Sequence, residues 1–361
     1  MLNAFQRLNM KTLINDNIQK MKPYLPPIEG RRSFGGLLLN FNERTTPFGN
    51  CVIGALKKLS DENKMQLYPE YGQIEKSIAK YAGVKPENIM LTNGSDQGID
   101  IIFRAFTKAR DRVIIPSPSF AMFYQCAEMM ANKILMPQYD EDKKMSFPMK
   151  EILSMVVQKP KLIVICNPNN PTGTLITIDK IEKILQKAKN SIVYIDEAYY
   201  EFSGVTAVKL LSKYKNLVIT STFSKAFGLA ALRVGYIIAS PKIILEMKKI
   251  RGPYDISMPA VCGTTAVLKN KNKLQTYVRE VMRRSKPMLE NFFTANNITY
   301  YPSGANFILF KPNNPKSVFA KLQKQGIIIR PRKLTTEMLR VTTGTVEQTR
   351  QFIDTYKKIL L

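Results

Sequence analysis

One lysine of the chain, Lys225, has neighbours that could turn its side chain into a nucleophile. It lies within residues 221–229, among hydroxyl-bearing, small and apolar side chains, and Arg233 follows in an otherwise apolar stretch. Desolvation and a nearby cation lower the pKa of a lysine, and the free amine can then attack a carbonyl group. The pattern therefore predicts a nucleophilic amine at this position.

A carboxylate with an unusual setting precedes this lysine. Asp196 ends the apolar run that includes Tyr194 and Ile195. A buried carboxylate without a partner is costly, so Asp196 should have a cationic partner, and a protonated ring nitrogen would serve. Tyr199 follows three residues later. The alternatives are a helix cap for Asp196 and a core position for Tyr199.

Two further segments carry polar groups directly after apolar runs. Residues 92–96, Thr-Asn-Gly-Ser-Asp, open a helix, and the free backbone N–H groups there could hold a phosphate together with the hydroxyl of Ser95. The same residues also suit an ordinary turn and cap. Residues 167–173 contain two Asn-Pro steps, which indicate an irregular loop that presents an amide side chain.

The composition narrows the chemistry. The chain of 361 residues has no histidine, which excludes Ser-His and Cys-His nucleophile pairs and most zinc sites, and we expect no metal. Proton transfer must use Lys, Tyr, Asp or Glu. The formal charge of +26 comes from dispersed residues, so we expect a solvated basic surface and no nucleic-acid partner. The four cysteines form no C-x-x-C pair, which favours free thiols.

The elements that must position these residues alternate between strand and helix. Short Val- and Ile-rich runs predict a mostly parallel sheet sandwiched by helices, an α/β architecture, with the amphipathic run Asp96–Ala109 as its clearest helix. The expected strands are Asn88–Thr92, Arg112–Ile115, Lys161–Cys166, Ser191–Ile195, Leu217–Thr220 and Val234–Ala239. Ligands bind where such strands end.

The pattern changes after Ser240 to long helical stretches, including Lys273–Asn296. Short strands are then expected at Asn306–Phe310, Ile327–Arg330 and Leu339–Thr342, and a last helix at Val346–Leu360. These features predict an N-terminal arm over 1–42 that packs on the small domain or a partner, a large domain over 43–250 and a smaller α+β domain over 251–361. No run is apolar and long enough to span a membrane, and we expect a cytoplasmic protein.

These segments together resemble the fold-type-I pyridoxal-phosphate enzymes of the aspartate-aminotransferase superfamily. Within them, the chain is most similar to the histidinol-phosphate aminotransferase branch of the class I/II aminotransferases. The similarity runs from Leu39–Glu43 to Leu339–Thr345 and includes Tyr68–Gly72 and Tyr81–Pro86. Four motifs in this order and at compatible spacing make the resemblance specific.

The resemblance implies a role for each residue. Lys225 would form the Schiff base with pyridoxal 5'-phosphate and move the substrate proton, and Asp196 would pair with the ring nitrogen. Catalysis would rest on Lys225, Asp196 and Tyr199. The other expected cofactor contacts are Gly94, Ser95, Asp96, Phe120, Asn170, Tyr199, Thr222, Ser224 and Arg233, with Tyr68 from the neighbouring subunit of a homodimer. Plain core packing is the alternative for Phe120.

For the substrate, the resemblance implies Arg340 and Tyr24, and we add Arg330 because it is expected to end the strand before Arg340. We expect histidinol phosphate as the amino donor and 2-oxoglutarate as the acceptor, with Arg330 supplying a second charge because histidinol phosphate has no carboxylate. The alternatives are an aromatic amino acid aminotransferase, a lyase or decarboxylase such as the threonine-phosphate type, and a regulator that binds DNA. The last is weakened because the sequence has no N-terminal helix-turn-helix extension.

Two departures from the family pattern stand out. Gln97 stands where the family often has Glu, which should leave the phosphate-binding backbone intact and remove one charge. The run Arg330-Pro331-Arg332-Lys333 is more basic than the family pattern, and the link from it to Arg340 is short. The second departure bears on the substrate and not on the cofactor.

Overall fold

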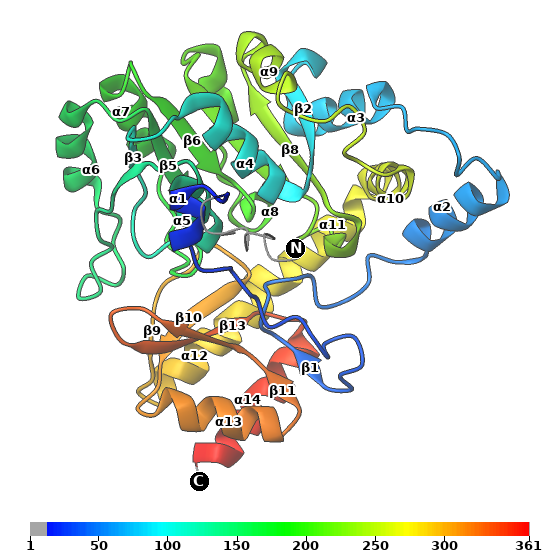
Figure 1. Cartoon of the computed structure of the whole chain (residues 1–361). Helices are drawn as coiled ribbons and strands as arrows, with labels where there is room; N and C mark the ends of the chain where they lie inside the picture. Colours follow the sequence, from blue (N-terminus) through cyan, green and yellow to red (C-terminus); the bar gives the residue numbers. More distant parts are fainter. Residues whose placement is uncertain (1–12, 361) are drawn as a thin grey trace, which may run out of the picture.

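A seven-stranded sheet forms the centre of the larger part of the protein (Figure 1). The computed structural model describes residues 13–360. The strand order is β2-β8-β7-β6-β5-β3-β4, and only β8 runs antiparallel to its neighbours. The strands are β2 (Ile89–Asn93), β3 (Arg112–Ile114), β4 (Lys133–Leu135), β5 (Leu162–Cys166), β6 (Ile192–Asp196), β7 (Leu217–Thr222) and β8 (Val234–Ala239). The predicted mostly parallel α/β architecture is confirmed.

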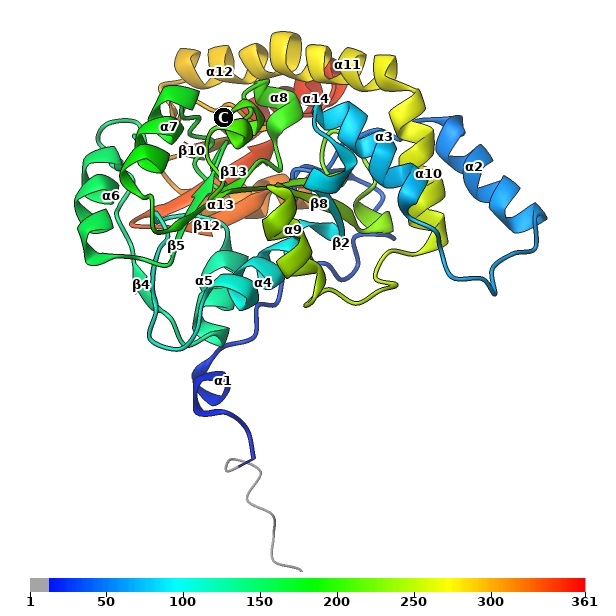
Figure 2. The same cartoon turned by 90° about the horizontal axis from the view of Figure 1, so that it is seen from above.

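The predicted strands of this sheet begin and end within two residues of their expected bounds. The edge strand β4 was not expected, because three residues that are not fully buried form no recognisable pattern. Helices cover both faces of the sheet (Figure 2). One face is covered by α4 (Gly94–Phe106), α5 (Ala121–Met129) and α9 (Pro241–Lys248), and the other by α3 (Gly72–Ala82), α6 (Met149–Met155) and α7 (Ile178–Lys187).

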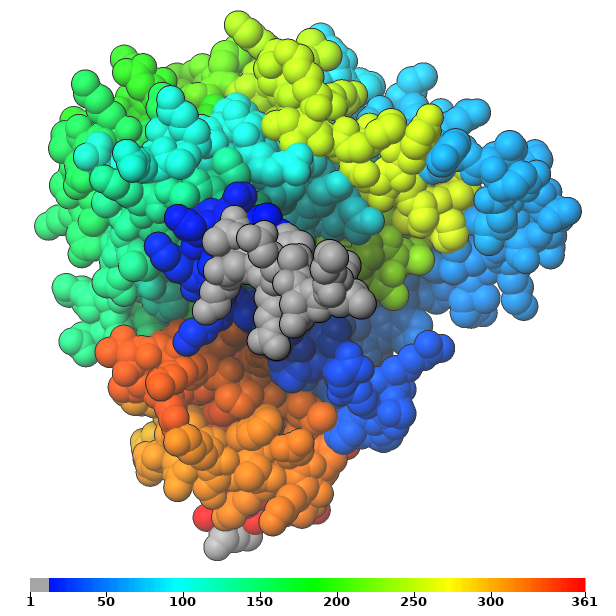
Figure 3. Space-filling view, viewed as in Figure 1, coloured from blue at the N-terminus to red at the C-terminus, as the bar shows by residue number. Residues whose placement is uncertain are grey.

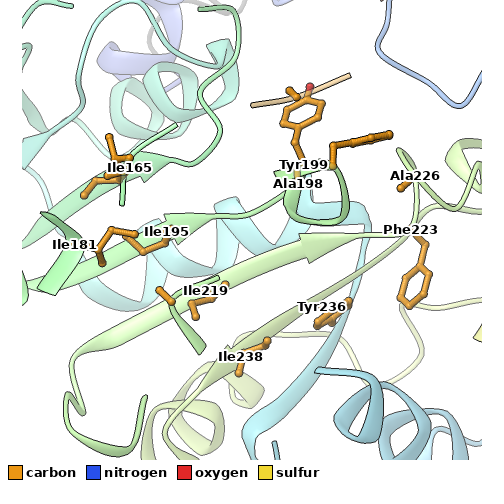
Figure 4. Packing of buried hydrophobic residues seen from close by; sticks show 14 of the residues in the cluster. Ile165, Ile181, Ile195, Ala198, Tyr199, Ile219, Phe223, Ala226, Tyr236 and Ile238 are labelled. Carbon is orange, nitrogen blue, oxygen red and sulfur yellow. The ribbon is translucent and has the colours of Figure 1, made fainter. Parts of the chain in front are cut away.

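A row of isoleucines crosses the sheet just before its polar end. Four neighbouring strands place these side chains in register: Ile165, Ile195, Ile219 and Ile238 (Figure 4). Their exposed fractions are 0–2%. Branched side chains that are fully buried on a pleated sheet hold the strands in one register. The next residue of β6 is Asp196, so this row sets the height at which the carboxylate leaves the sheet.

A second, smaller sheet forms the lower part of the protein in Figure 1. Its antiparallel strands follow the order β12-β13-β10-β9. They are β9 (Thr299–Tyr300), β10 (Phe307–Lys311), β12 (Arg330–Lys333) and β13 (Glu337–Thr342), and α12 (Lys286–Ala295), α13 (Pro315–Lys324) and α14 (Val346–Leu360) cover one face. The other face turns Phe307, Leu309 and Met338 into the hydrophobic core beside the large sheet.

The predicted strand Ile327–Arg330 was wrong, because Arg330 does not end a strand. Ile327 and Ile328 form β11, which pairs in parallel with β1 (Leu37–Leu38), whereas Arg330 begins β12 and pairs antiparallel with β13. Two different partners therefore divide one apolar run into two strands. Arg330 lies directly opposite Arg340 in this second pairing.

The predicted helix Lys273–Asn296 is a continuous helical path with an internal change of pitch. It consists of α11 (Lys271–Glu280), a π-helical turn at Val281–Ser285, and α12, and it runs along the upper edge of Figure 2. The remaining helices are α1 (Asp16–Lys20), α2 (Asn50–Asp61), α8 (Tyr200–Ser203) and α10 (Met258–Lys269). Short 3-10 turns occur at Pro86–Asn88, Val156–Gln158, Val208–Ser212 and Ala230–Leu232.

The N-terminal segment contacts both parts of the protein. The amide of Asn17 in α1 donates to the carbonyl of Met129 at the end of α5 at 2.6 Å, and β1 joins β11 of the smaller part. In Figure 3 this blue segment lies over the boundary between the two parts. Residues 1–12 of the expected arm lie outside the described residues. No helix between residues 13 and 360 has both the length and the apolar character needed to cross a membrane.

Candidate active site

The carboxylate of Asp196 is buried at the end of β6, with 2% of the residue exposed. The N–H of Ala198 donates to its Oδ1 at 2.9 Å, and the hydroxyl of Tyr194 donates to Oδ2 at 3.4 Å. No lysine or arginine within residues 13–360 forms an ion pair with it. Burial raises the pKa of Asp196 to about 7. One oxygen thus serves a local turn, as the cap alternative requires, and the other remains suited to a buried cation.

The amine of Lys225 lies in the loop after β7 and is prepared for nucleophilic chemistry. Its Nζ donates to the carbonyl of Phe41 at 2.9 Å and lies 5.9 Å from the centre of the Tyr199 ring. Desolvation lowers the pKa of Lys225 to about 8, and the charge of Arg340 contributes. At neutral to mildly basic pH a substantial fraction of this lysine is therefore the free amine.

Tyr199 and Asn170 join the same cluster through long-range hydrogen bonds. The amide of Asn42 donates to the Tyr199 hydroxyl at 3.0 Å. The guanidinium of Arg340 donates to Oδ1 of Asn170 and, at 2.7 Å, to the carbonyl of Asn40. Burial raises the pKa of Tyr199 to about 12, so its hydroxyl stays protonated and can donate to an oxygen. The ring of Tyr199 packs edge-on against Phe307, with ring centres 5.2 Å apart, as the core alternative requires. Its hydroxyl instead belongs to the polar cluster.

Glycine makes the start of α4 a close-fitting cradle. Gly94 has a φ of +68°, which favours glycine, and a Cβ there would lie 2.4 Å from Nη2 of Arg233. A Cβ on Gly235 of β8 would lie 2.5 Å from the backbone of Gly94. Only glycine at both positions lets strand β8 approach the N–H groups in the first turn of α4. The N–H of Gly94 donates to the carbonyl of Arg233 at 3.1 Å, and the N–H groups of the following residues in this turn have no intrahelical partner and can bind an anion.

Hydroxyl and guanidinium groups surround this cradle. Arg233 donates to Asp96 at 2.9 Å and to the Ser224 hydroxyl at 3.4 Å. The N–H of Ser224 in turn donates to the hydroxyl of Thr222 at 3.1 Å. The cluster combines a cation, two hydroxyls and a helix start, which is the donor set that a phosphate needs.

Gln97 anchors the cradle and does not weaken it. Its Oε1 accepts from the N–H of Asn93 at 2.6 Å, and its Nε2 donates to Asp255 at 2.6 Å. The side chain therefore reaches back over the helix start in the manner of a capping box. The backbone of the cradle remains intact, as expected. The amide also donates a hydrogen bond to Asp255, which a carboxylate could not do.

Two expected cofactor residues lie at the margin of the cluster. Phe120 precedes α5 and packs edge-on against Phe123, with ring centres 5.7 Å apart, so its core alternative is at least partly correct. Tyr68 is 70% exposed, and its ring stacks on Tyr254 at 3.9 Å. Within a single chain, no described contact joins Tyr68 to the cluster.

Two of the expected substrate residues, Arg330 and Arg340, lie on the inner face of the small sheet, and Tyr24 belongs to the N-terminal segment. Arg330 lies over the ring of Phe41, 5.1 Å from its centre, and opposite Arg340 in the strand pairing. Burial, and after it the neighbouring arginines, lowers the pKa of Arg340, and the phenol of Tyr24 lies near enough to oppose this shift. The structure thus brings the three expected residues together.

Three contributors were missed at the level of the sequence. The Phe41 carbonyl and the Asn42 amide bind Lys225 and Tyr199, and both residues belong to the motif Leu39–Glu43 that carried the resemblance without being assigned a role. Arg332 was noted only as excess charge. Burial is the main cause of the lowered pKa of Arg340, and the charge of the nearby Arg332 guanidinium is the second cause.

The residues present fit pyridoxal phosphate in three independent respects. A partly desolvated lysine is available for an aldehyde, an unpaired buried carboxylate for a cationic ring nitrogen, and a glycine-lined helix start for a phosphate. Such a match of an amine, an acid and an anion cradle at the carboxyl ends of parallel strands specifies both the chemistry and the orientation of the cofactor.

Comparisons with known proteins agree with this assignment. The family model for aminotransferase class I and II matches residues 36–355. A histidinol-phosphate aminotransferase from Ruminiclostridium cellulolyticum is 35% identical over 82% of this chain and 86% of its own. The histidinol-phosphate aminotransferase of Sinorhizobium meliloti, solved in complex with pyridoxal-5'-phosphate, has a TM-score of 0.87 at 20% identity and covers 100% of this chain and 99% of its own.

A decarboxylase shares the same fold. The L-threonine-O-3-phosphate decarboxylase of Porphyromonas gingivalis has a TM-score of 0.77 at 23% identity and covers 90% of this chain and 99% of its own. At that identity the likeness extends to the fold alone, whereas the family match and the 35% identical relative extend to the activity class. The chain therefore belongs to the class I and II aminotransferases and is a pyridoxal-phosphate-dependent transaminase.

Proposed function

We propose that this transaminase transfers the amino group of histidinol phosphate to 2-oxoglutarate and so forms glutamate. The observation that carries the proposal is the pair Arg330 and Arg340, which lie opposite each other on adjacent strands. Neither guanidinium has an acidic partner among residues 13–360. Two neighbouring cations suit a substrate with a doubly charged group better than one with a single carboxylate.

The residues of the cluster divide the chemistry between them. Pyridoxal phosphate, when bound, supplies an aldehyde for the amino group and a ring that takes up electrons from the substrate α-carbon. The amine of Lys225 would then hold and move the proton of that carbon, because its lowered pKa of about 8 leaves part of it unprotonated near neutral pH. Asp196 would stabilise positive charge on the ring nitrogen, and Tyr199 and Asn170 would orient the ring through hydrogen bonds.

Both substrates would use the same arginines. Histidinol phosphate has no carboxylate, so its phosphate would meet Arg330 and Arg340, with the hydroxyl of Tyr24 as an additional donor. The acceptor 2-oxoglutarate would present its carboxylates to the same groups. The relative from Ruminiclostridium cellulolyticum bears the name of this activity, which supports the choice of donor.

Two alternatives share the cofactor apparatus. An aromatic amino acid donor would need one cation for its carboxylate and leave the other unpaired. A threonine-phosphate decarboxylase would need both a carboxylate and a phosphate site, which several arginines could supply, and a protein of that kind shares the fold. Formation of glutamate from 2-oxoglutarate distinguishes a transaminase from a decarboxylase, which makes none.

We also propose a homodimer in which Tyr68 reaches the cofactor of the neighbouring subunit. Tyr68 lies in an exposed apolar region that a single chain leaves uncovered. The large apolar side chains of this region and their exposed fractions are Met65 61%, Leu67 56%, Tyr68 70% and Tyr254 55%. Clustered exposed apolar side chains of this size are typical of subunit contacts.

Lys225→Ala should abolish turnover, by at least about ten thousandfold, because the covalent link to the cofactor and the proton carrier are both lost. The wild type should be yellow and should bleach with borohydride, whereas the variant should not react. Lys286→Ala is the control, since burial also lowers the pKa of Lys286 but its ammonium binds the carbonyl of Ser303. A wild type without colour after cofactor addition would contradict the central assignment.

Asp196→Asn should lower activity by about a hundredfold to a thousandfold, because it removes the charge that keeps the ring nitrogen protonated. The same change should stabilise the cofactor-free protein. The folded-state pKa of about 7 exceeds the ordinary 3.8, so stability is present at low pH and is lost as the pH rises through 7. Thermal melting at pH 8 should show the gain, of about 1–3 kcal/mol.

Glu197→Gln is the matched control for this experiment. Glu197 is equally buried, but its carboxylate accepts from the N–H of Ala207 at 2.7 Å. It should gain stability at pH 8 without a comparable loss of turnover. Near-normal activity of Asp196→Asn would mean that the carboxylate of Asp196 is only a cap.

Tyr68→Phe should weaken cofactor binding about tenfold, since one hydrogen bond to a charged group is lost, and should leave the dimer intact. Equilibrium dialysis measures the cofactor, and sedimentation measures the assembly. Tyr300→Phe, a change of the same kind on the small sheet, should alter neither. A fully active monomer would refute the shared site.

Histidinol phosphate should convert the bound cofactor to its amine form faster than any other amino donor, with aromatic amino acids next. Arg330→Ala should raise the Michaelis constant for histidinol phosphate about tenfold to a hundredfold and affect phenylalanine much less. Lys333→Ala, on the exposed face of the same strand, is the control. If phenylalanine or tyrosine reacts readily and histidinol phosphate does not, the enzyme is an aromatic aminotransferase and the role of Arg330 is wrong.

A further inference from the structure

Strand β12 presents two arginines to the same side. Its residues alternate in burial, with Arg330 and Arg332 half-buried and Pro331 and Lys333 exposed. Successive side chains of a strand point to opposite faces, so Arg330 and Arg332 share the face that turns toward the cofactor site. The partner of Arg332 in β13 is Met338, which is 1% exposed and belongs to the core between the sheets.

Arg332 has no compensating charge in the described chain. Its Nε is buried and has no hydrogen-bond partner, and no ion pair joins its guanidinium to another of residues 13–360. Burial lowers the pKa of Arg332, the charge of Arg330 lowers it further, and the phenols of Tyr24 and Tyr199 oppose the shift. The guanidinium is thus surrounded by groups of the site and lacks an anion.

Each of the other arginines of the region has a partner within the protein. Arg340 donates to Asn170 and Asn40, Arg31 pairs with Glu43, and Arg233 pairs with Asp96. Arg330 contacts the ring of Phe41. Nε of Arg340 is also buried without a partner, but Arg340 donates through its other two nitrogens, whereas no hydrogen bond or ion pair engages any atom of Arg332 within residues 13–360. Retaining this charge without a partner is unfavourable unless a ligand supplies the anion.

We propose that Arg332 is a specificity-determining residue which, together with Arg330, forms a two-guanidinium subsite for the second negative charge of a dianionic substrate. The proposal rests on the proposed function and names the substrate class of the same site. A phosphate monoester carries nearly two charges at neutral pH, and planar guanidinium groups match its oxygens. A distal carboxylate of a dicarboxylic oxo acid would occupy the same place.

This subsite explains how one enzyme would accept two chemically different partners. Histidinol phosphate carries both negative charges on its phosphate, whereas 2-oxoglutarate carries them on two carboxylates. Arg340 would take the first charge in either case, and Arg330 with Arg332 would take the second. An aromatic amino acid carries a single negative charge and would leave the subsite unfilled, so Arg332 should select against it.

Matched pairs of ligands test the proposal by calorimetry on the full-length enzyme with its cofactor. One pair is 2-oxoglutarate and 2-oxobutanoate, and the other is histidinol phosphate and histidinol; the members of each pair differ in the group that would carry the second charge. Arg332→Met should weaken binding of 2-oxoglutarate and histidinol phosphate at least about tenfold and change binding of the members that lack the distal carboxylate or the phosphate less than about threefold. Arg332→Lys, which keeps the charge but not the planar fork, should lie between these values.

Control measurements separate a binding role from a structural one. Lys333→Met removes a cation from the exposed face of the same strand and should leave both ratios unchanged. If Arg332 had a structural role, its substitution would lower kcat for every donor alike, whereas loss of the proposed subsite would raise the Michaelis constant for dianionic substrates alone. If Arg332→Met does not fold, Arg332→Gln should show the same preference loss with an unchanged melting temperature.

The outcomes also distinguish this proposal from the choice of donor. An unchanged ratio for 2-oxoglutarate over 2-oxobutanoate in both Arg332→Met and Arg332→Gln overturns the subsite, whatever the donor. If the wild type binds histidinol phosphate no better than histidinol, the choice of donor is overturned. If Arg332→Met then still loses the preference for 2-oxoglutarate over 2-oxobutanoate, the subsite is supported for dicarboxylates.

Discussion

The structure depends on keeping several ionisable groups out of water at one place. Asp196, Lys225 and Arg340 each lose solvation when they are buried, and the pKa shifts of all three show that the protein compensates this loss only in part. Compensation comes from backbone groups, the N–H of Ala198 and the carbonyls of Phe41 and Asn40, and from the side chains of Tyr194 and Asn170. The cofactor and the substrate then complete a charge balance that the chain leaves open, which is how preorganised electrostatics favour a transition state.

Residues close together in the sequence were predictable, whereas contacts between distant segments were not. Lys225, Asp196 and Gly94 stand in short motifs directly after apolar strands, so their type and their location at the strand ends follow from local pattern. Arg330 was placed at the wrong end of a strand because the division between β11 and β12 depends on two separate pairing partners. The contact of Asn42 with Tyr199, across 157 residues, leaves no periodic signal at all.

The two sheets contribute different groups to the site. The large sheet supplies the groups that suit the cofactor, and these lie on loops after rigid parallel strands. The small sheet supplies Arg330, Arg332 and Arg340 from a hairpin whose link is only Leu334–Thr336. Because a decarboxylase shares this fold, the fold alone does not select the reaction, and under our proposal the choice of substrate would rest with the hairpin. A link this short fixes the spacing of the arginines, since it leaves the two strands little freedom to slide past each other.

The hydrogen bonds that join the region of Leu39–Asn42 to β13 also determine when the enzyme can form. The N–H of Thr342 donates to the carbonyl of Leu39 at 2.9 Å, and Arg340 reaches Asn40 across 300 positions. Closing a flexible loop of that length costs about 5 kcal/mol of chain entropy before any contact repays it. During synthesis, the segment with Lys225 emerges well before Arg340. At that stage the carbonyl of Phe41 is not yet held in place, and the arginine that helps to lower the pKa of Lys225 is missing. Contacts across such a separation form late in folding, so a chain that stops before Arg340 would contain every strand of the large sheet and would lack the guanidinium that joins Asn40 to Asn170.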